Sequence, residues 1–587
     1  MPQEVVNLAP DATLCGLGDS ASFEVAVLGA GAAGMAAAVF AALAGARVIL
    51  IERSEYLGGT SAYSGGTIWI PNTLFRDLLG AEDSPENALA FLDAAVGNRA
   101  PRALRQTFVE NGPEAVRILE TRTEMKFRGR SFHPDYLSDL PGATRFGRAL
   151  EPEPFDATPL GSDLALIRPT IPEFTILGGM MVDRDDIAHL LRMKRNPRSA
   201  LYAVRMFLRF LGHKRRFGRD ARLVMGNAMI ARLLASARKL GVIIATRAEV
   251  TGLLCSSNGS VDGLSVEQGG HRLRLDVSGG VILASGGFTR HPARRQTMLP
   301  QPVPEYSPSA PGHTGRLQDM ALELGAHYPE SHDQPCFWAP VSLRKRADGS
   351  TAVFPHFVFD RSKPGVISVG RDGRRFVNES TSYHLFGKAM FEANSDASHI
   401  PCHMIADSRA LMAYGMGAIR PGGYGLRAAL ADGYVTRANS VQALAKAIGV
   451  DPAGLADSVA RMNRFAETGV DEDFARGTTV YERANGDASH GPNPTLGKLS
   501  RPPYYAMKLY PADIGASIGL VTDPNARVQR RDGSVIEGLY AVGNDAASIM
   551  GGTYPGPGIT IGPGITFGYI AARHAAGRAG KESLNAA

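Results

Sequence analysis

The sequence predicts an α/β protein in which a parallel-sheet domain is made of two chain segments, with an α+β domain inserted between them. Two observations predict this architecture. A strand–turn–helix–strand unit spans residues 24–52, and another apolar strand occurs near the far end of the chain, at 538–545. The composition agrees, because 44% of the 587 residues are hydrophobic and 20% are charged. These values favour a large core and exclude an intrinsically disordered chain.

The parallel sheet is predicted from short apolar runs. EVAVLG (24–29) is typical of a buried parallel strand, the alanine-rich run to Ala46 of a helix, and RVILIE (47–52) of a second strand. Further strands of the same sheet are expected at 241–250, 279–287 and 538–545, and a final helix at 565–577.

The middle of the chain has a different pattern. Proline-rich residues 301–312 predict a linker, and residues 336–499 mix strands and loops with a helical stretch at 440–450. Proline-rich loops then return the chain. We therefore expect three parts: a polar tail at 1–22, one domain made of 23–335 and 500–587, and an inserted domain at 336–499.

A glycine-rich turn after the first strand predicts a dinucleotide site. The glycines of GAGAAG (29–34) make the turn, let the backbone approach a pyrophosphate and pack the helix on the sheet. The helix N-terminus then faces the phosphates. Glu52 ends the next strand, 18 residues after Gly34, where a carboxylate can accept hydrogen bonds from ribose hydroxyls. NAD and FAD share this fingerprint.

Two further loops favour FAD and a Rossmann-like FAD-binding domain. YLGGTSAYSGG (56–66) offers amides and hydroxyls to a diphosphate and a flavin, and GLYAVGND ends a strand near the C-terminus. Each loop taken alone is also an ordinary turn, but two of them at opposite ends of the chain favour FAD. The predicted FAD contacts are Gly29, Gly31, Ala32, Ala33, Gly34, Glu52, Arg53, Gly58, Gly59, Thr60, Ser61, Gly65, Gly66, Val250, Ala284, Gly286, Gly543, Asn544, Asp545, Gly558, Ile559 and Ile561.

The positive charge is concentrated in one segment. Residues 192–222 carry eleven Lys and Arg and one acid, a local +10, so the rest of the +6 chain has a net charge of −4. No nucleic-acid-binding module surrounds this segment, and we expect no nucleic-acid partner. The stretch LYAVRMFLRFL (201–211) makes it a basic amphipathic helix, which can lie on an anionic bilayer. A solvated basic face with a buried apolar side fits the same residues.

Cysteine spacing and the N-terminus indicate the compartment. Cys15, Cys255, Cys336 and Cys402 lie far apart, without a CxxC, iron–sulfur or haem-attachment pattern, so we expect no metal. The start MPQEVVNLAPD lacks the basic residues and apolar run of a signal peptide. We therefore expect a cytoplasmic protein, with peripheral contact to the inner face of the membrane through 192–222 left open.

Several motifs together resemble the fumarate reductase/succinate dehydrogenase flavoprotein superfamily. They are GAGAAG, GGTSAYSGG, LASGGF (283–288), GRRFVNES (373–380) and GLYAVGN, and the resemblance covers most of residues 24–575. It implies an FAD domain of two segments and an inserted capping domain, with the substrate between them. The loop SAYSGG has no His, the residue that carries covalent flavin in succinate dehydrogenases, so we expect non-covalent FAD.

Two departures from that superfamily argue against a dicarboxylate substrate. Tyr383 stands where the resemblance places the Arg that donates a proton in fumarate reductases. The segment MGGTYPGPGITIG (550–562) also has no cation, whereas those enzymes carry Arg and His there. A doubly charged substrate would have no partner, so we exclude fumarate and succinate.

Within this superfamily, the sequence is closely similar to the 3-ketosteroid Δ1-dehydrogenases. The most specific signal is the run TYPGPGITIGP (553–563), supported by SGGTIWIPN (64–72), HPDYLSDLPG (133–142), GRALEPEPFD (147–156) and MGNAMIARLL (225–234). The resemblance implies a 3-ketosteroid substrate and an external electron acceptor, a quinone or another compound. It also implies residue roles: Tyr136 supports Tyr383, Tyr383 takes the α-proton, and Tyr554 with the Gly558 amide holds the ketone oxygen.

Other readings stay open. A sibling enzyme that desaturates a smaller cyclohexanone-type ketone needs the same motif, because both substrates are enolisable ring ketones. The related Δ4-(5α)-dehydrogenases lack the TYPGPG turn, and a flavoprotein that only binds steroid would not need both Tyr383 and Tyr554. The aromatic residues expected either to line an apolar slot or to belong to the core are Phe337, Trp338, Phe354 and Phe357.

Overall fold

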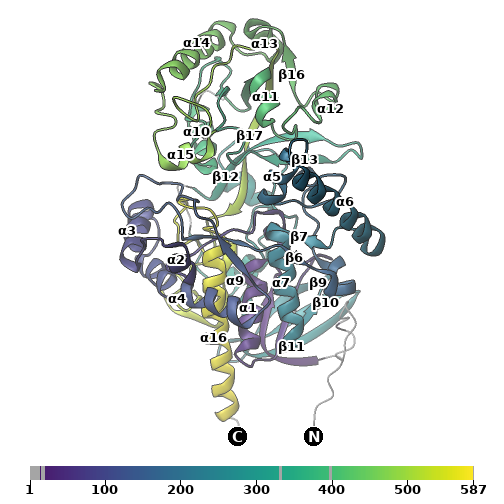
Figure 1. Cartoon of the computed structure of the whole chain (residues 1–587). Helices are drawn as coiled ribbons and strands as arrows, with labels where there is room; N and C mark the ends of the chain where they lie inside the picture. Colours follow the sequence, from purple (N-terminus) through teal and green to yellow (C-terminus); the bar gives the residue numbers. More distant parts are fainter. Residues whose placement is uncertain (1–13, 15–19, 330–333, 396–398, 586–587) are drawn as a thin grey trace.

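The computed structural model describes residues 14, 20–329, 334–395 and 399–585, and it shows two domains, one above the other (Figure 1). The lower domain contains an eight-stranded sheet whose main path is β18–β19–β11–β1–β2–β8. Its strands are β1 (Ser20–Leu28), β2 (Val48–Ile51), β8 (Ile243–Ala245), β9 (Ala248–Cys255), β10 (Val261–Gln268), β11 (His271–Leu283), β18 (Arg527–Gln529) and β19 (Val535–Ala541).

The centre of this sheet is parallel, as predicted. β1 lies between β11 and β2, with Val25 opposite Gly280 on one side and Val48 on the other. The expected strand at 241–250 is two strands, because the chain turns at Arg247, which has a positive φ of 52°. β8 continues the parallel sheet, whereas β9 pairs with β10.

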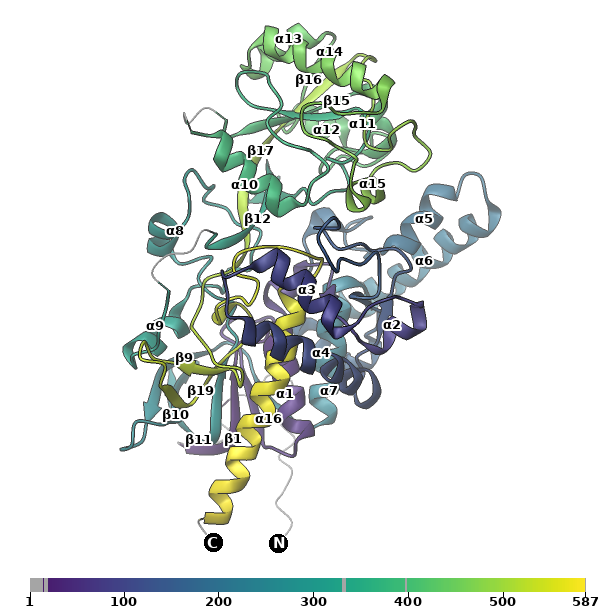
Figure 2. The same ribbon diagram turned by 90° about the vertical axis from the view of Figure 1, so that its left-hand side faces the viewer.

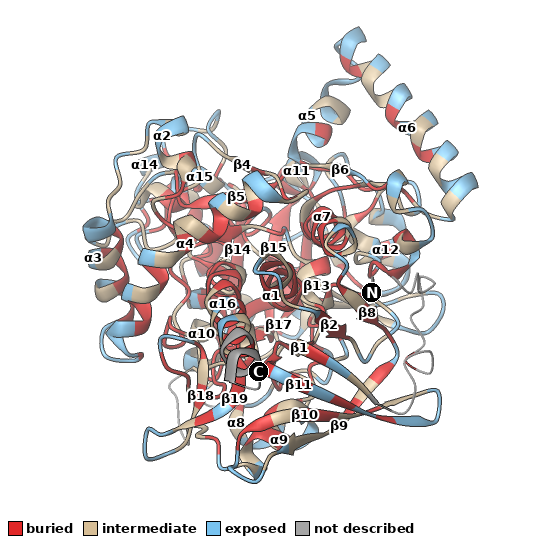
Figure 3. Ribbon diagram, turned by 90° about the horizontal axis from the view of Figure 1, so that it is seen from below, coloured by how far each residue is buried: buried red, intermediate tan, exposed pale blue. Residues whose placement is uncertain are grey.

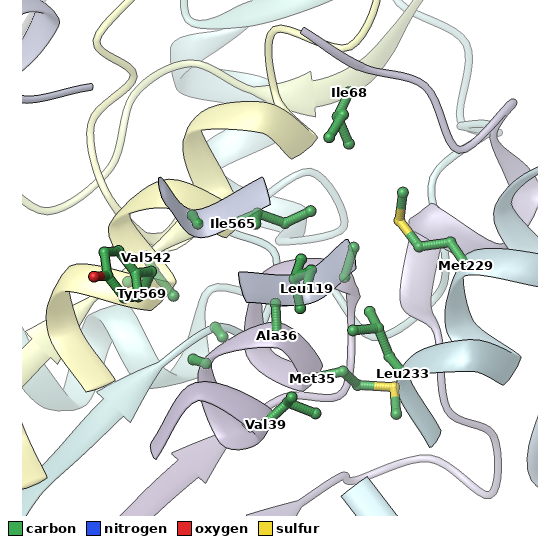
Figure 4. Close-up of a cluster of buried hydrophobic side chains, with 14 of the residues drawn as sticks. Met35, Ala36, Val39, Ile68, Leu119, Met229, Leu233, Val542, Ile565 and Tyr569 are labelled. Atoms are coloured by element: carbon green, nitrogen blue, oxygen red, sulfur yellow. The ribbon is translucent and has the colours of Figure 1, made fainter. Parts of the chain in front are cut away.

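Four helices pack around the apolar core beside this sheet: α1 (Ala32–Leu43), α4 (Arg102–Arg122), α7 (Met225–Lys239) and α16 (Ile561–Asn585). Figure 4 shows Met35 and Val39 of α1 near Leu233 of α7 and Leu119 of α4. The sequence placed the final helix at 565–577, but α16 starts directly after the TYPGPG turn. The C-terminal segment thereby contributes two strands, β18 and β19, and a helix to the N-terminal domain.

The upper domain is built on a second sheet, with the path β13–β12–β17–β15–β14 and with β16 paired to β17. Its strands are β12 (Cys336–Lys345), β13 (Thr351–Pro355), β14 (Val366–Val369), β15 (Cys402–Asp407), β16 (Thr436–Ala438) and β17 (Tyr504–Ala516). Its helices are α10 (Tyr383–Ala393), α11 (Ser408–Tyr414), α12 (Leu426–Ala431), α13 (Val441–Ile448), α14 (Pro452–Thr468) and α15 (Val480–Asn485).

Three expected boundaries differ from the structure. β17 pairs with β12 and β15 of the insertion, so the upper sheet continues past the expected end at residue 499. β1 starts inside the expected tail 1–22, and Leu14 is buried; the other residues before Ser20 lie outside the described part of the chain. Residues 301–312 are no free linker, because the Ala310 amide donates to the Thr60 hydroxyl at 2.8 Å.

Shorter elements complete the structure. They include a small sheet, β3 (Ile68–Trp69), β5 (Ala149–Pro152) and β4 (Phe127–Gly129), and the pair β6 (Phe155–Asp156) and β7 (Arg222–Leu223). The remaining helices are α2 (Leu74–Leu79), α3 (Pro85–Val96), α8 (Pro292–Met298) and α9 (Arg316–Glu323), together with a hairpin of α5 (Arg184–Arg192) and α6 (Pro197–Phe217). Figure 2 shows α2 and α3 on one side of the lower domain and α8 and α9 on the other. Figure 3 shows the α5–α6 hairpin projecting from the body.

Candidate active site

A cavity of about 970 Å³ runs from the glycine turn after β1 to the junction of the two domains. Both predicted groups of residues line it. The dinucleotide loops lie at one end, and Tyr136, Tyr383 and Tyr554 lie where the upper domain covers the lower one.

The GAGAAG turn has the geometry of a phosphate cradle. Gly29 has a φ of 109°, and a Cβ there would lie 2.4 Å from the Ala284 carbonyl oxygen. A Cβ on Gly34 would lie 1.9 Å from the Gly29 oxygen, so only glycine lets α1 pack this closely. The N-cap residue of α1 is Gly31, which has no side chain to place over the helix end, and this N-terminal end lines the cavity.

Glu52 holds the turn as well as facing the cavity. Its carboxylate accepts hydrogen bonds from the amides of Ala30, at 3.0 Å, and Ser54, at 2.9 Å. These bonds fix the carboxylate at the carboxyl end of β2, where the fingerprint places the ribose-binding acid.

The second loop is tied to the first and to a residue that the sequence did not identify. The Gly58 amide donates to the Ala30 carbonyl at 2.7 Å, and the Ser61 hydroxyl accepts from the Ala32 amide at 3.2 Å. His313 Nε2 lies 3.2 Å from the Thr60 hydroxyl. Burial lowers the pKa of His313 to about 4, so this ring is neutral near pH 7.

All but four of the predicted FAD contacts line the cavity; the exceptions are Gly34, Gly58, Asp545 and Ile559. Gly34 and Gly58 act in packing, and Ile559 belongs to the core. Asp545 is fully buried and accepts hydrogen bonds from the Ser285 and Gly287 amides. It therefore supports the turn after β11 instead of facing the cavity. The helix end at the cavity, the glycine contacts and the fixed Glu52 together fit FAD.

Three tyrosines meet at the other end of the cavity. The hydroxyls of Tyr136 and Tyr383 lie 3.5 Å apart. The ring of Tyr383 meets that of Tyr554 edge to face, with centroids 5.0 Å apart, and Tyr136 stacks on Tyr554 at 5.9 Å. Tyr383 and Tyr554 are buried in the domain junction, whereas Tyr136 is half-buried and faces the cavity.

The TYPGPG turn points two donors at one place. Gly558 has a φ of 94°, and a Cβ there would lie 2.3 Å from the Thr67 carbonyl oxygen. The Gly558 amide donates to the Tyr554 hydroxyl oxygen, which also interacts with the side chains of Thr560 and Tyr383. The phenol O–H and the backbone N–H thus lie side by side, as the two donors of an oxyanion hole do.

Buried groups behind the turn hold it in place. The Trp69 indole N–H donates to Asp135 at 2.7 Å, and Arg148 pairs with the same carboxylate at 3.0 Å. A Cβ on Gly556 would lie 2.6 Å from the Trp69 ring, so the indole packs directly on the turn. The segment before Tyr136 and the turn after Tyr554 thus share one buried support.

The environment of the tyrosines opposes their ionisation. Burial raises the pKa of Tyr383 well above 10, and a negative charge on the neighbouring phenol of Tyr136 or Tyr554 would raise it further. Burial also raises the pKa of Tyr554. The next residue, His384, is kept neutral, because burial lowers its pKa to about 3.

Of the four aromatic residues considered for an apolar slot, two line the cavity. They are Phe354 and Phe357, and Phe357 meets Tyr383 edge to face at 5.0 Å. Phe337 and Trp338 are core residues, although Phe337 backs the Tyr554 ring at 5.2 Å. The sequence did not identify Tyr481, which also lines the cavity.

The basic segment forms the projecting hairpin (Figure 3). Phe210 and Met206 of α6 are buried against Met180 and Val182 of the body. A second apolar stripe, Leu201, Val204, Leu208 and Leu211, is exposed at helical spacing, with Leu208 60% exposed. In the described part of the chain, no helix combines the length and apolar character that a bilayer span requires.

Residues 24–561 match the family of FAD-binding domains. The chain is 35% identical over 573 residues to the 3-oxosteroid 1-dehydrogenase of Mycobacterium tuberculosis, covering 95% of this chain and 99% of the relative. It is 36% identical over 564 residues to the 4-oxocyclohex-2-ene-1-carboxylate 5-dehydrogenase of Sinomonas cyclohexanicum, covering 94% of this chain and 93% of that one.

A solved structure agrees with this similarity. The 3-ketosteroid Δ1-dehydrogenase of Sterolibacterium denitrificans, in complex with 1,4-androstadiene-3,17-dione, superposes with a TM-score of 0.87 at 34% identity. The match covers 95% of this chain and 99% of that chain.

Proposed function

Since this chain belongs to the family of FAD-dependent dehydrogenases that includes the 3-oxosteroid 1-dehydrogenases, we propose that it introduces the 1,2 double bond into 3-ketosteroids. The observation that carries the proposal is the meeting of Tyr383 with Tyr554 and the Gly558 amide in one buried site. Such a reaction needs a polarised ketone, a base for the α-proton and an acceptor for the hydride.

FAD, when bound, supplies the hydride acceptor. The cavity residues around the GAGAAG turn, Glu52 and the loop at 58–66 would hold it. We propose that this binding is non-covalent, because the loop SAYSGG contains no His to form a flavin bond.

The chain's own residues prepare the ketone and take the proton. The Tyr554 hydroxyl and the Gly558 amide donate to the C3 oxygen, and this makes the C2 proton more acidic. Tyr383 takes that proton as a phenolate. The Tyr136 hydroxyl, 3.5 Å away, donates to the phenolate oxygen and stabilises it. Tyr383 is also the first residue of α10, where the helix dipole favours a negative charge.

A second candidate substrate is a smaller ring ketone, because the Sinomonas relative that acts on a 4-oxocyclohexene carboxylate is as similar to this chain as the steroid enzymes are. The deciding experiment mixes the holoenzyme anaerobically with androst-4-ene-3,17-dione or with 4-oxocyclohexanecarboxylate. We expect the steroid to bleach the flavin and to become the 1,4-diene. Bleaching by the small ketone alone would overturn the steroid assignment.

Two partners complete the proposal. An external acceptor, a quinone or another compound, must reoxidise the enzyme after each turnover. We also propose that the α5–α6 hairpin lies on an anionic membrane, since the exposed apolar stripe of α6 stands among cations such as Arg205 and Arg215. Steroids partition into lipid, so this placement would bring the enzyme to its substrate.

A further inference from the structure

A fourth tyrosine borders the site and has no assigned role. Tyr481, on α15, is only 3% exposed and lines the cavity. Among the described residues, its hydroxyl has no hydrogen-bond partner. Its ring, in contrast, is firmly placed, because it packs on the ring of Tyr136 with centroids 4.7 Å apart.

The backbone of Tyr481 joins the two domains at the same point. Its amide donates to the hydroxyl of Ser138 at 3.1 Å, and Ser138 lies two residues after Tyr136. Helix α15 of the upper domain is thus fixed to the segment of the lower domain that carries Tyr136.

The next residue of α15, Glu482, supports the loop that carries Tyr383. The Glu482 carboxylate is buried and accepts from the Asn378 side-chain amide at 2.9 Å and from the Gly477 amide at 2.7 Å. Asn378 also accepts from the Ser380 amide at 2.9 Å, which shapes the loop that leads into Tyr383. Consecutive residues of one short helix therefore contact the supports of both Tyr136 and Tyr383.

We infer that α15 keeps the hydroxyls of Tyr136 and Tyr383 within hydrogen-bonding distance of each other. Tyr481 and Glu482 are then positioning residues for the proton abstraction. This inference rests on the proposed function. The two hydroxyls lie 3.5 Å apart, at the outer limit of a hydrogen bond, so a small shift of either segment separates them. The Tyr481 ring prevents that shift by packing, and the Glu482 carboxylate prevents it by hydrogen bonding.

The ionisable groups around the pair decide how this role would appear in a pH profile. Tyr136 and Tyr554 face Tyr383, and Tyr481 and Arg184 face Tyr136. Arg361, Glu482 and Tyr554 face Tyr481. Burial lowers the pKa of Arg361 to about 10, and its guanidinium remains charged below that pH. It donates to backbone carbonyls, including that of Glu379, and every variant compared below retains it.

The test compares Tyr481→Leu with Tyr481→Phe in the FAD-loaded enzyme. Leu removes the ring that packs on Tyr136, and we expect kcat to fall by about 10²-fold, the effect of a displaced catalytic group. Without the Tyr136 hydrogen bond, the pKa of the Tyr383 phenol rises, so the ascending limb of kcat should move to higher pH by about one unit. KM should change little. Phe keeps the ring and removes an unpartnered hydroxyl, so it should match the wild type.

Glu482→Gln provides a second variant with the shape of the side chain preserved. We expect the ascending limb to move in the same direction, because the carboxylate loses its charge-assisted hydrogen bonds to Asn378 and to the Gly477 amide. A uniform loss of rate in Tyr481→Leu, with the limb unmoved, would mean a merely structural role. A loss in Tyr481→Phe equal to that in Tyr481→Leu would make the hydroxyl the active part, and both results overturn the inference.

A readout without steroid separates this inference from the proposed function. The ultraviolet absorption of tyrosinate is followed against pH in the holoenzyme, and subtracting the same titration of Tyr383→Phe isolates Tyr383 from the other tyrosines, since the chain has 17. A wild-type enzyme that oxidises no 3-ketosteroid would overturn the proposed function. The tyrosinate titration would still decide between the variants: an upward shift in Tyr481→Leu but not in Tyr481→Phe supports positioning by α15, and identical curves contradict it.

Discussion

The backbone amide of Tyr136 donates to the carbonyl of Pro555 at 2.8 Å, and this bond joins the base-supporting tyrosine to the turn that carries Tyr554. The groups that would hold the ketone and those that would assist the base are therefore one unit, reinforced by Trp69, Asp135 and Arg148. A substrate that docks its ketone on this unit has its α-carbon placed at the same time. The predictions below test the parts of the unit one by one.

The first prediction concerns the hydroxyl of Tyr554. Tyr554→Phe removes one donor to the ketone oxygen and keeps the ring contacts with Tyr383 and Phe337. We expect kcat to fall by about 10²–10³-fold, the usual effect of losing one oxyanion donor. Steady-state rates with an artificial acceptor measure this, and the FAD content of the variant serves as the control. Turnover near that of the wild type would contradict the polarising role.

The second prediction concerns pH. Tyr383 must lose its proton to act as base, and burial raises its pKa, so activity should increase as the solution becomes alkaline. Tyr554 must keep its proton to donate, so activity should fall again at high pH. We expect a bell-shaped profile with an alkaline optimum, its two limbs belonging to coupled phenols. A profile that is flat from neutral to alkaline pH would argue against a phenolate base.

The third prediction isolates proton abstraction. In deuterated solvent and without a working acceptor, the wild-type enzyme should exchange the C2 proton of a 3-ketosteroid if its abstraction precedes hydride loss and is reversible. Tyr383→Phe should lose both exchange and turnover, yet still bind FAD and show a steroid-induced change in the flavin spectrum. Mass spectrometry of the recovered steroid measures the exchange. If exchange persists in the variant, another residue takes the proton.

The fourth prediction concerns the α5–α6 hairpin. The enzyme should co-sediment with anionic vesicles at low salt, and changing Arg205, Arg209, Lys214, Arg215 and Arg216 to Gln should abolish this. Replacing five exposed arginines outside the hairpin by Gln gives a charge-matched control that should still sediment; they are Arg272, Arg274, Arg371, Arg374 and Arg409. Leu201→Ser with Leu208→Ser should weaken binding even in low salt. If the five-Gln variant sediments with vesicles as much as the wild type does, the hairpin is not the membrane-binding element.

The fifth prediction concerns stability. Glu379 is fully buried between Arg375, at 2.7 Å, and Arg476, at 3.0 Å. Burial acts to raise its pKa, but the two guanidinium groups outweigh this and lower it. Glu379→Gln takes away the carboxylate that pairs with the buried Arg476, while Arg375 keeps its pair with Asp471 at 2.8 Å, and the change should reduce the free energy of unfolding by about 3–5 kcal/mol. Denaturant unfolding monitored by circular dichroism measures this difference.

The same carboxylate gives stability a defined pH dependence. Because its pKa is lower in the folded protein, its contribution is complete above the unfolded pKa, about 4.3. The contribution is lost as pH falls through the lower folded value. Acidification below about pH 4 should therefore destabilise the wild type more than Glu379→Gln.

Local spacing explains why much of the dinucleotide site could be predicted. A glycine turn, a helix start and a carboxylate at the next strand end lie within about 25 neighbouring residues, so their geometry follows from the local βαβ unit. His313 was not predicted because its contact, Thr60, lies 253 residues away in the sequence, and no local sequence pattern indicates that contact. Tyr481 was not predicted for the same reason, since the ring it packs on, that of Tyr136, belongs to the other domain. Tyr383 was found by its motif alone.

Domain boundaries were harder to predict than the site. The proline-rich loop before Tyr504 reads as the return to the lower domain, yet the strand that follows is held on both edges by strands of the insertion. Hydrophobic periodicity and turn residues locate a strand in the sequence, but they do not predict which other strands it pairs with. Which sheet a strand joins depends on pairing between distant segments.

The position of β17 has a consequence for synthesis of the chain. It lies in the middle of the upper sheet, while β19 and α16, later still, complete the sheet and core of the lower domain. The upper sheet cannot be completed before β17, Tyr504–Ala516, has been made, and the lower domain has to wait for β19 and α16, so apolar surfaces of both stay uncovered until late in synthesis. Emerging chains should therefore depend on chaperones, and truncation shortly before Tyr504 should yield aggregates rather than an isolated folded domain.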